Sequence, residues 1–275
     1  MSSSARMKFE TESSSLFYVY CIVPLEVSPG LGTECSELGF SPVYFIPYKD
    51  IAAVVSKVPE SEFGQREITG RVKNLEWLGF AASSHESVIE KIMYNKATPI
   101  PMKFCTIFNS EKKIVDLLRN GYASYRVQLD QIASKVEVGV VVYISDSGKE
   151  STQKDSTPVS RLRKKIDSAK PGAAYFLKQD LKSLEMAELN RKALLISKNV
   201  FRFLTENAVA SAMNHIETAR SGSAPAGKRT ILNAAFLVEK AKIESFRKKA
   251  RQVGTKYPEV RLKVTGPWPP YNFCA

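Results

Sequence analysis

The C-terminal end of the chain constrains its fold more than any other stretch. Residues 260–264 alternate apolar and basic side chains (Val-Arg-Leu-Lys-Val), which is typical of a β-strand with one face on a core and the other in water. Residues 266–273 follow with three prolines, Trp268, Tyr271 and Phe273. Because proline fixes φ and lacks a backbone donor, we expect this tail neither to continue a sheet nor to start a helix, but to form a polyproline-like segment. Its aromatic side chains need a partner, either the protein's own core, which we favour, or another molecule.

The size of the chain favours two domains, since 275 residues are many for one core. No stretch approaches the roughly 20 apolar residues that a membrane-spanning helix needs, so we expect no membrane association. Residues 1–15 are serine-rich and are predicted to be a disordered leader. Four cysteines without CxxC spacing (Cys21, Cys35, Cys105 and Cys274) argue against a disulfide framework or a structural zinc site and fit a reduced, cytoplasmic setting.

The first half predicts a smaller α+β domain over residues 16–134. Residues 16–23, 43–46 and 51–55 are apolar and aromatic runs that favour strands, and the last two are close enough to form a hairpin. A helix is expected from about 72 to 94, with one apolar face. Ser110 is a candidate N-cap for a second, long helix that ends this domain near Ile132. The predicted face of the first helix consists of Leu75, Leu78, Ala82, His85, Ile89 and Ile92.

The second half predicts a ferredoxin-like domain over residues 135–265, with an antiparallel sheet and helices on one face. Strands are expected at 136–144, 230–238 and 260–264, and helices at 161–168, 178–219 and 239–253. Residues 145–160 and 220–229 are polar or small and are predicted to be flexible loops. Residues 266–275 form the separate proline and aromatic tail.

The candidate catalytic residues are few. His85 and Glu86 are adjacent, but His85 falls on the apolar stripe of its helix, where a buried, hydrogen-bonded histidine is the simpler interpretation. A nucleophile formed by Cys105 and His85 stays open, because such groups meet only in the fold. His215 is distant in sequence, and no phosphate-binding loop is visible. We therefore predict no enzyme activity, no metal and no cofactor.

Basic residues are the strongest sign of a binding function. The net charge is +12, and one helix contributes Lys240, Lys242, Arg247, Lys248 and Arg251, expected opposite its apolar side chains. This face is either simply solvated or a docking surface for an acidic protein or a nucleic acid. Neither half shows the aromatic pattern of RNA-recognition folds, so a basic nucleic-acid-binding module is kept as the alternative function. Trp268 and Tyr271 join these five residues as candidate partner contacts.

Several segments, in this order, resemble the F/L family of gas-vesicle accessory proteins. The tail Gly-Pro-Trp-Pro-Pro-Tyr-x-Phe is one, and the helix with Trp77 and His85-Glu86-Ser87-Val88 is another. Residues 17–23, 99–108, 172–176 and 233–238 also occupy comparable places, so the likeness spans residues 16–273. Cys105 stands where the family often has glycine, which puts the local turn in question because a side chain disfavours positive φ.

The resemblance implies a non-enzymatic minor component of gas vesicles, the protein-walled flotation organelles of the prokaryotic cytoplasm. Such proteins are thought to bind the hydrophobic major shell protein, to assist nucleation and assembly and to limit aggregation. The resemblance also implies contacts with other accessory proteins, and for some members a place on the gas-facing side of the wall. An apolar groove with a charged rim would suit such a partner, and the basic helix would supply that rim.

Overall fold

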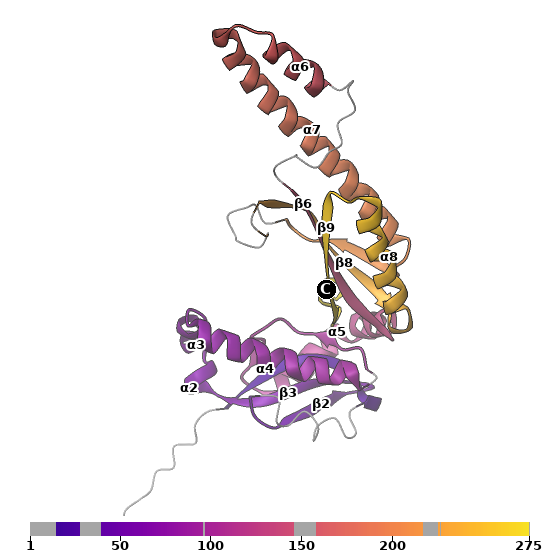
Figure 1. Cartoon of the computed structure of the whole chain (residues 1–275). Helices are drawn as coiled ribbons and strands as arrows, with labels where there is room; N and C mark the ends of the chain where they lie inside the picture. The colour runs from indigo at the N-terminus through magenta and orange to yellow at the C-terminus, as the bar shows by residue number, and fades with distance from the viewer. Residues whose placement is uncertain are drawn as a thin grey trace, which may run out of the picture. The chain divides into compact units, whose positions relative to one another are not determined.

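The computed structural model of the chain describes residues 15–27, 40–95, 97–145, 158–216, 225 and 227–274. These residues form two compact units, one of Met1–Lys135 with Pro269–Ala275 and one of Val136–Trp268 (Figure 1). The predicted leader, Cys35 and most of the loops predicted at 145–160 and 220–229 lie outside the described residues. Both units combine a β-sheet with helices, so the α+β class is confirmed.

The sheet of the first unit is antiparallel and is centred on β1 (Ser15–Pro24). One edge of β1 pairs with β3, and the other edge pairs with two short strands. The predicted hairpin is confirmed between β2 and β3, where Lys49 takes a φ of 53° in the turn. The other strands are β2 (Val43–Tyr48), β3 (Ile51–Pro59), β4 (Ile100–Pro101) and β5 (Ile107–Phe108).

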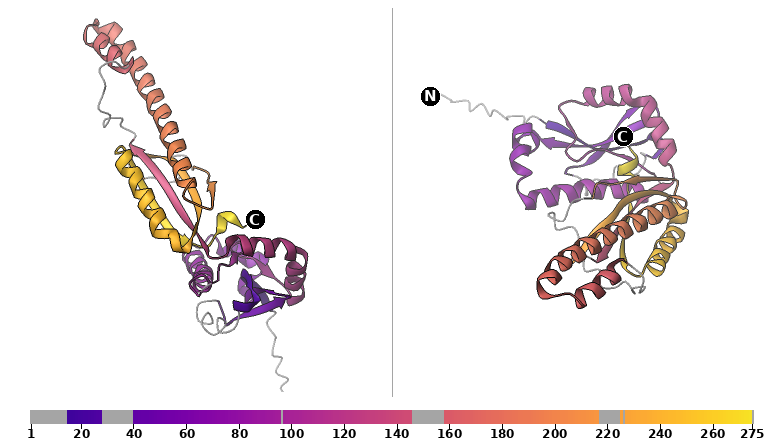
Figure 2. Two further views of the ribbon diagram at one scale, coloured as in Figure 1. Left: turned by 90° about the vertical axis from the view of Figure 1, so that its right-hand side faces the viewer. Right: turned by 90° about the horizontal axis from the view of Figure 1, so that it is seen from above.

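Two helices cover opposite faces of this sheet, as the right-hand view of Figure 2 shows. On one face, Tyr18 and Tyr20 share a core cluster with residues of α4 (Leu75–Tyr94). On the other, Val19 and Ile22 share a cluster with residues of α5 (Glu111–Ile132). Because both faces are covered, β1 is apolar at nearly every position rather than at alternate ones.

The helix boundaries of the first unit differ in part from the sequence expectations. Residues 60–71, to which the sequence analysis assigns no element, form α2 (Glu60–Phe63) and α3 (Gln65–Arg71). The next helix begins at Leu75 rather than at residue 72, because the Asn74 side chain accepts hydrogen bonds from the backbone N–H groups of the first turn. Leu75 is 82% exposed and is not part of the buried stripe, whose first buried residue is Ala81. The N-cap role of Ser110 is confirmed, since its side chain accepts from the Lys113 N–H.

The second unit has a four-stranded sheet in the order β7-β8-β6-β9. Its helices α7 and α8 share one core cluster with one face of that sheet. The two central strands of this sheet, β6 and β8, are its first and third strands in chain order. Helices α6 and α7 follow β6, and α8 follows β8, which is the split β-α-β arrangement. The elements are β6 (Lys135–Ser145), α6 (Pro158–Asp167), α7 (Pro171–Thr205), β7 (Ala210–Met213), β8 (Lys228–Glu239), a 3₁₀ turn η2 (Lys240–Lys242), α8 (Ile243–Lys256) and β9 (Val260–Trp268).

The long helix α7 spans Pro171–Thr205, not 178–219. It starts earlier because Pro171 occupies the first turn, where a missing N–H costs nothing. It ends earlier because the Asn207 side chain donates to the Phe203 carbonyl, and the Val209 N–H then pairs with the Leu237 carbonyl of β8. The strand β7 therefore occupies residues predicted to be helical.

The tail also departs from the expectation. Pro267 and Trp268 continue β9, with Trp268 opposite Glu137, so the prolines do not exclude the sheet. Proline is tolerated where its missing donor is not needed by the ladder. The last residues are not polyproline-like either, because Tyr271–Phe273 form a 3₁₀ turn. They belong to the first unit.

Candidate functional site

The basic residues predicted as a partner surface lie on η2 and α8, but they are not equivalent. Lys242 forms an ion pair with Glu239 at 2.9 Å. Arg247 forms one with Glu244 at 2.9 Å, and its Nη2 donates to the Gly266 carbonyl at 2.7 Å. Arg247 therefore holds the end of β9 and lies at the edge of the helix, not opposite its buried face.

Lys248 and Arg251 are the two residues of this set that lie on α8 together with Arg247. Both are exposed, and they are three positions apart on α8, which places them on one face. Among the described residues, neither forms an ion pair. Lys240 is half-buried, and burial lowers the pKa of its amine. Of the five basic residues predicted as a partner surface, Lys248 and Arg251 are thus the two that are exposed and form no ion pair with the described residues.

A groove of about 420 Å³ lies beside this face, between α7 and α8. Phe203 and Tyr257 are its partly exposed aromatic residues, whereas Val200 and Val253 beneath them are almost fully buried. The Lys249 Nζ lies 5.9 Å from the centre of the Phe203 ring, and the Lys256 Nζ lies 5.7 Å from that of Tyr257. The lysine stems lie along apolar surface while their charges face outward. The complete lining is Asn199, Val200, Phe203, Gln252, Val253, Thr255, Lys256 and Tyr257.

Trp268 and Tyr271 have different environments. Trp268 is 40% exposed, so our expectation that it packs internally is wrong. Tyr271 is half-buried against the core cluster of the first unit, and its hydroxyl donates to Glu86 Oε1 at 2.8 Å. Burial and the neighbouring Glu86 carboxylate raise the pKa of Tyr271, and burial raises the pKa of Glu86. Tyr271 therefore anchors the tail, and of the two only Trp268 offers an open aromatic surface.

The interior around His85 has the geometry of a structural network. The Cys105 N–H donates to the Tyr18 hydroxyl at 3.0 Å, and that hydroxyl shares a hydrogen bond with His85 Nδ1, also at 3.0 Å. His85 is 2% exposed, and burial lowers its pKa to about 4, so the imidazole is neutral near pH 7. Burial raises the pKa of the Cys105 thiol, the opposite of what an activated nucleophile needs.

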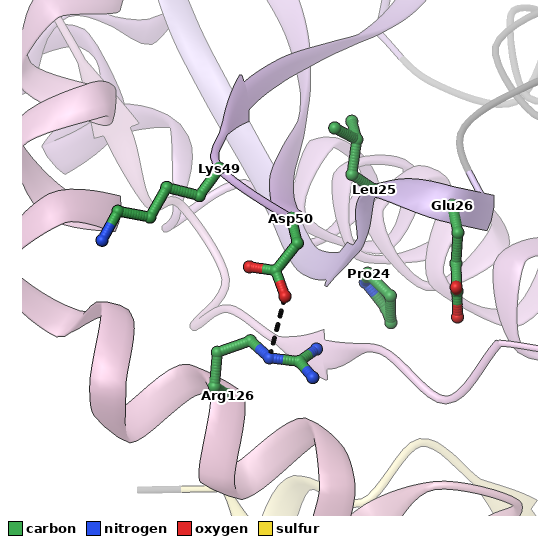
Figure 3. Close-up of a pocket in the computed structure, with 6 residues that line it drawn as sticks. All are labelled: Pro24, Leu25, Glu26, Lys49, Asp50 and Arg126. Atoms are coloured by element: carbon green, nitrogen blue, oxygen red, sulfur yellow. Dashed lines mark ion pairs between the residues drawn. The ribbon is translucent and has the colours of Figure 1, made fainter.

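A second cavity, of about 400 Å³, lies in the first unit, and two of its lining residues, Asp50 and Arg126, form an ion pair (Figure 3). Arg126 Nε lies 3.2 Å from Asp50, and the Tyr122 hydroxyl donates to the same carboxylate at 2.6 Å. This hydrogen bond, followed by Arg126 and Lys49, lowers the pKa of Asp50. The described part of the chain brings together no group of three or more acidic, histidine or cysteine side chains that could hold a metal.

Comparison with known proteins decides the family. The family model described as gas vesicle synthesis protein GvpL/GvpF matches residues 16–275. The chain is a member of the GvpL/GvpF family. The resemblance inferred from the sequence is thus confirmed, and the protein has an accessory role in gas vesicles. The family is one of gas vesicle proteins, not a known class of enzymes.

Individual relatives of the GvpL/GvpF family cover nearly the whole chain. Gas vesicle protein L of Streptomyces sp. (strain CB03234) is 26% identical over 86% of this chain and 85% of its own. Gas vesicle protein F2 of Halobacterium salinarum is 23% identical over 95% and 93%. The crystal structure of GvpF from Anabaena sp. PCC7120 superposes with a TM-score of 0.64 at 21% identity, covering 95% of this chain and 97% of that one. That likeness supports the fold.

Two further observations bear on the GvpL/GvpF assignment. Cys105 has a φ of 62°, so the turn keeps the left-handed conformation that a glycine would adopt freely. No helix among the described residues combines the length and apolar character needed to traverse a bilayer.

The α7–α8 groove was missed by sequence reasoning. Phe203 is only partly buried and lines the groove. The available signal was the pair Lys249 and Lys256, which are seven residues apart and therefore share one side of α8.

Proposed function

We propose that this gas vesicle accessory protein is a non-enzymatic assembly factor that binds the hydrophobic major shell protein and limits its aggregation during nucleation. The observation that carries the proposal is the α7–α8 groove, whose partly exposed Phe203 and Tyr257 lie beside the lysines Lys249 and Lys256. A shell subunit exposes apolar surface before it assembles, so a partner needs both apolar contact area and charge that keeps the complex soluble.

The exposed pair Lys248 and Arg251 supplies the steering charge in this proposal. Exposed charges mainly change the association rate and the salt dependence, whereas the apolar side chains of the groove determine how long the partner stays bound. Lys248 and Arg251 therefore steer an acidic part of the shell protein, and Phe203 retains its apolar part. Contacts with further accessory proteins and a place at the gas-facing side of the wall belong to the same proposal.

A pull-down of tagged protein with shell protein tests both roles. Lys248→Glu combined with Arg251→Glu should weaken capture at about 50 mM salt by about tenfold and have little effect at about 500 mM, because salt screens exposed charges. Phe203→Ala should weaken capture at both salt concentrations. Lys112→Glu with Lys113→Glu, an equal charge change on exposed residues of α5, is the matched control and should bind as wild type.

Capture that none of these variants alters would remove the groove and the basic face from the mechanism. A gel shift with single- and double-stranded RNA and DNA tests the alternative function, which is nucleic-acid binding. Tight, steeply salt-dependent binding there, without capture of shell protein, would favour that alternative.

A further inference from the structure

The outer part of α7 extends beyond the sheet of the second unit and carries α6 beside it. Figures 1 and 2 show the two helices as a hairpin that projects from that sheet. The buried residues of α7 begin only at Ala193, so 22 residues of the helix, about 33 Å at 1.5 Å each, precede the core. We call residues 158–192 the arm. An ion pair between Arg163 and Glu185 joins its two helices.

The interface between the two helices of the arm is incomplete. Apolar residues recur at helical spacing on both helices, as in a bundle. In the arm only Val159 and Ser160 are buried, whereas the inner half of α7, which the sheet covers, buries four residues. The apolar residues that stay partly exposed and lie outside the core of the second unit are Leu162, Ile166, Leu177, Leu181 and Leu184.

Large apolar side chains also lie open on the arm. Tyr175 is 61% exposed and Phe176 is 69% exposed, and their ring centres are 5.7 Å apart in an edge-to-face arrangement. Met186 is 48% exposed. Adjacent exposed aromatic residues are rare on a surface that meets only water and are enriched where proteins bind each other.

The charge of the arm indicates what covers it. Nine Lys and Arg residues stand against four Asp and Glu residues between 158 and 192, a net charge of +5. A second copy of the arm would bring the same charge and be repelled. Residues 146–157, the sequence that precedes the arm, contain no apolar side chain that could cover it. The positive charge of the arm therefore favours a partner from another molecule, with apolar and acidic side chains.

We propose that the arm binds an acidic amphipathic helix of a partner protein, which completes a three-helix bundle. The half-exposed leucine seam accepts the apolar face of such a helix, and Tyr175 and Phe176 pack at its side. Lys164, Lys165, Lys178 and Lys182, which are exposed, pair with its acidic residues. Asp180, Glu185 and Glu188 interrupt the positive surface, which disfavours a uniformly anionic lipid or nucleic acid. The arm site does not depend on the function proposed for the α7–α8 groove.

Fluorescence anisotropy with the full chain tests this site. The probe is a labelled synthetic helix of about three heptads with leucine at the a and d positions and mostly glutamate elsewhere. Wild type should bind it with a Kd of about 1–50 μM. The same peptide with lysine in place of glutamate should bind at least about tenfold more weakly.

Variants assign the binding to the arm. Tyr175→Ser with Phe176→Ser should weaken binding about tenfold at any salt concentration. Lys164→Glu with Lys165→Glu should weaken it about fivefold at low salt and less at high salt. Leu194→Ser with Leu195→Ser, which changes two equally exposed residues of the same helix outside the arm, should bind as wild type. Circular dichroism melts confirm that each variant is folded.

Each other outcome overturns the proposal. No binding of the acidic helix by wild type at about 1 mM, or equal binding by the arm variants, would exclude the site. Tighter binding of phosphatidylserine vesicles or of RNA, lost in the same variants, would identify the arm as a surface for those molecules. Sedimentation showing a dimer that Tyr175→Ser with Phe176→Ser dissociates would identify the partner as a second copy.

Discussion

Tyr271→Phe removes one hydroxyl and tests whether the tail holds the first unit together. The hydroxyl donates to Glu86 Oε1 at 2.8 Å, and Glu86 Oε2 is buried without a hydrogen bond to any described residue. In the variant, the Glu86 carboxylate therefore accepts no hydrogen bond from any described residue. A hydrogen bond to a charged group contributes about 1.5–3 kcal/mol. Because the pair is only partly buried, we expect a loss of about 2 kcal/mol at pH 7.

The pH dependence of this loss has a defined sign. Burial already raises the pKa of Glu86 above its ordinary value of 4.5, and the Tyr271 hydrogen bond opposes that rise. Without the hydroxyl the pKa in the folded state rises further, so the folded state binds more protons than the unfolded state. The stability of the variant therefore falls as pH rises from 4.5 through the folded-state pKa. The difference from the parent should be largest at neutral pH and small below the ordinary glutamate value.

Urea unfolding measures the effect. Trp77, whose ring centre lies 5.9 Å from that of Phe63 in the first unit, reports unfolding in a Trp268→Phe background. The matched control is Glu86→Gln, in which Tyr271→Phe should cost only about 0.5–1.5 kcal/mol and the same amount at every pH. An unfolding midpoint unchanged by Tyr271→Phe at pH 7, or a loss equal at pH 4 and pH 7 with Glu86 present, would refute the reasoning.

Two further predictions concern the backbone. Cys105→Gly should leave the protein about 1 kcal/mol more stable than Cys105→Ala, because only glycine adopts the φ of 62° without strain; equal unfolding free energies would show that this turn relaxes. Arg247→Ala should cost about 1 kcal/mol through the lost hydrogen bond to Gly266, whereas Lys248→Ala should stay within about 0.5 kcal/mol of wild type. The same denaturation assay, read from Trp268 in a Trp77→Phe background, would contradict the role of Arg247 if the two variants matched.

The central strands could be predicted from the sequence because a short run of consecutive apolar residues is typical of a strand whose two faces are both covered. Residues 16–23 and 136–144 are apolar at nearly every position, as strands in the middle of a sheet are. The buried histidine was also predictable, since His85 falls on the apolar face of its helix. Family membership followed from the order of several short segments, none of which is specific alone.

The remaining features depend on contacts between distant residues. The end of α7 is set by the pairing of Val209 with Leu237, which no local pattern reveals. Trp268 was expected to be buried because it is large and apolar, but the strand that carries it ends at that residue. The groove at Phe203 exists because α8 ends near that point of α7, so its location follows from packing between helices and not from either sequence alone.

The return of the last residues to the first unit has a consequence for truncation. Residues 136–268 make up the second unit, so removing residues 269–275 takes nothing from it. The first unit, by contrast, loses Pro269 and Pro270, which are both buried. A chain that ends at residue 268 should therefore keep a protease-resistant second unit, whereas its first unit is cut by proteases.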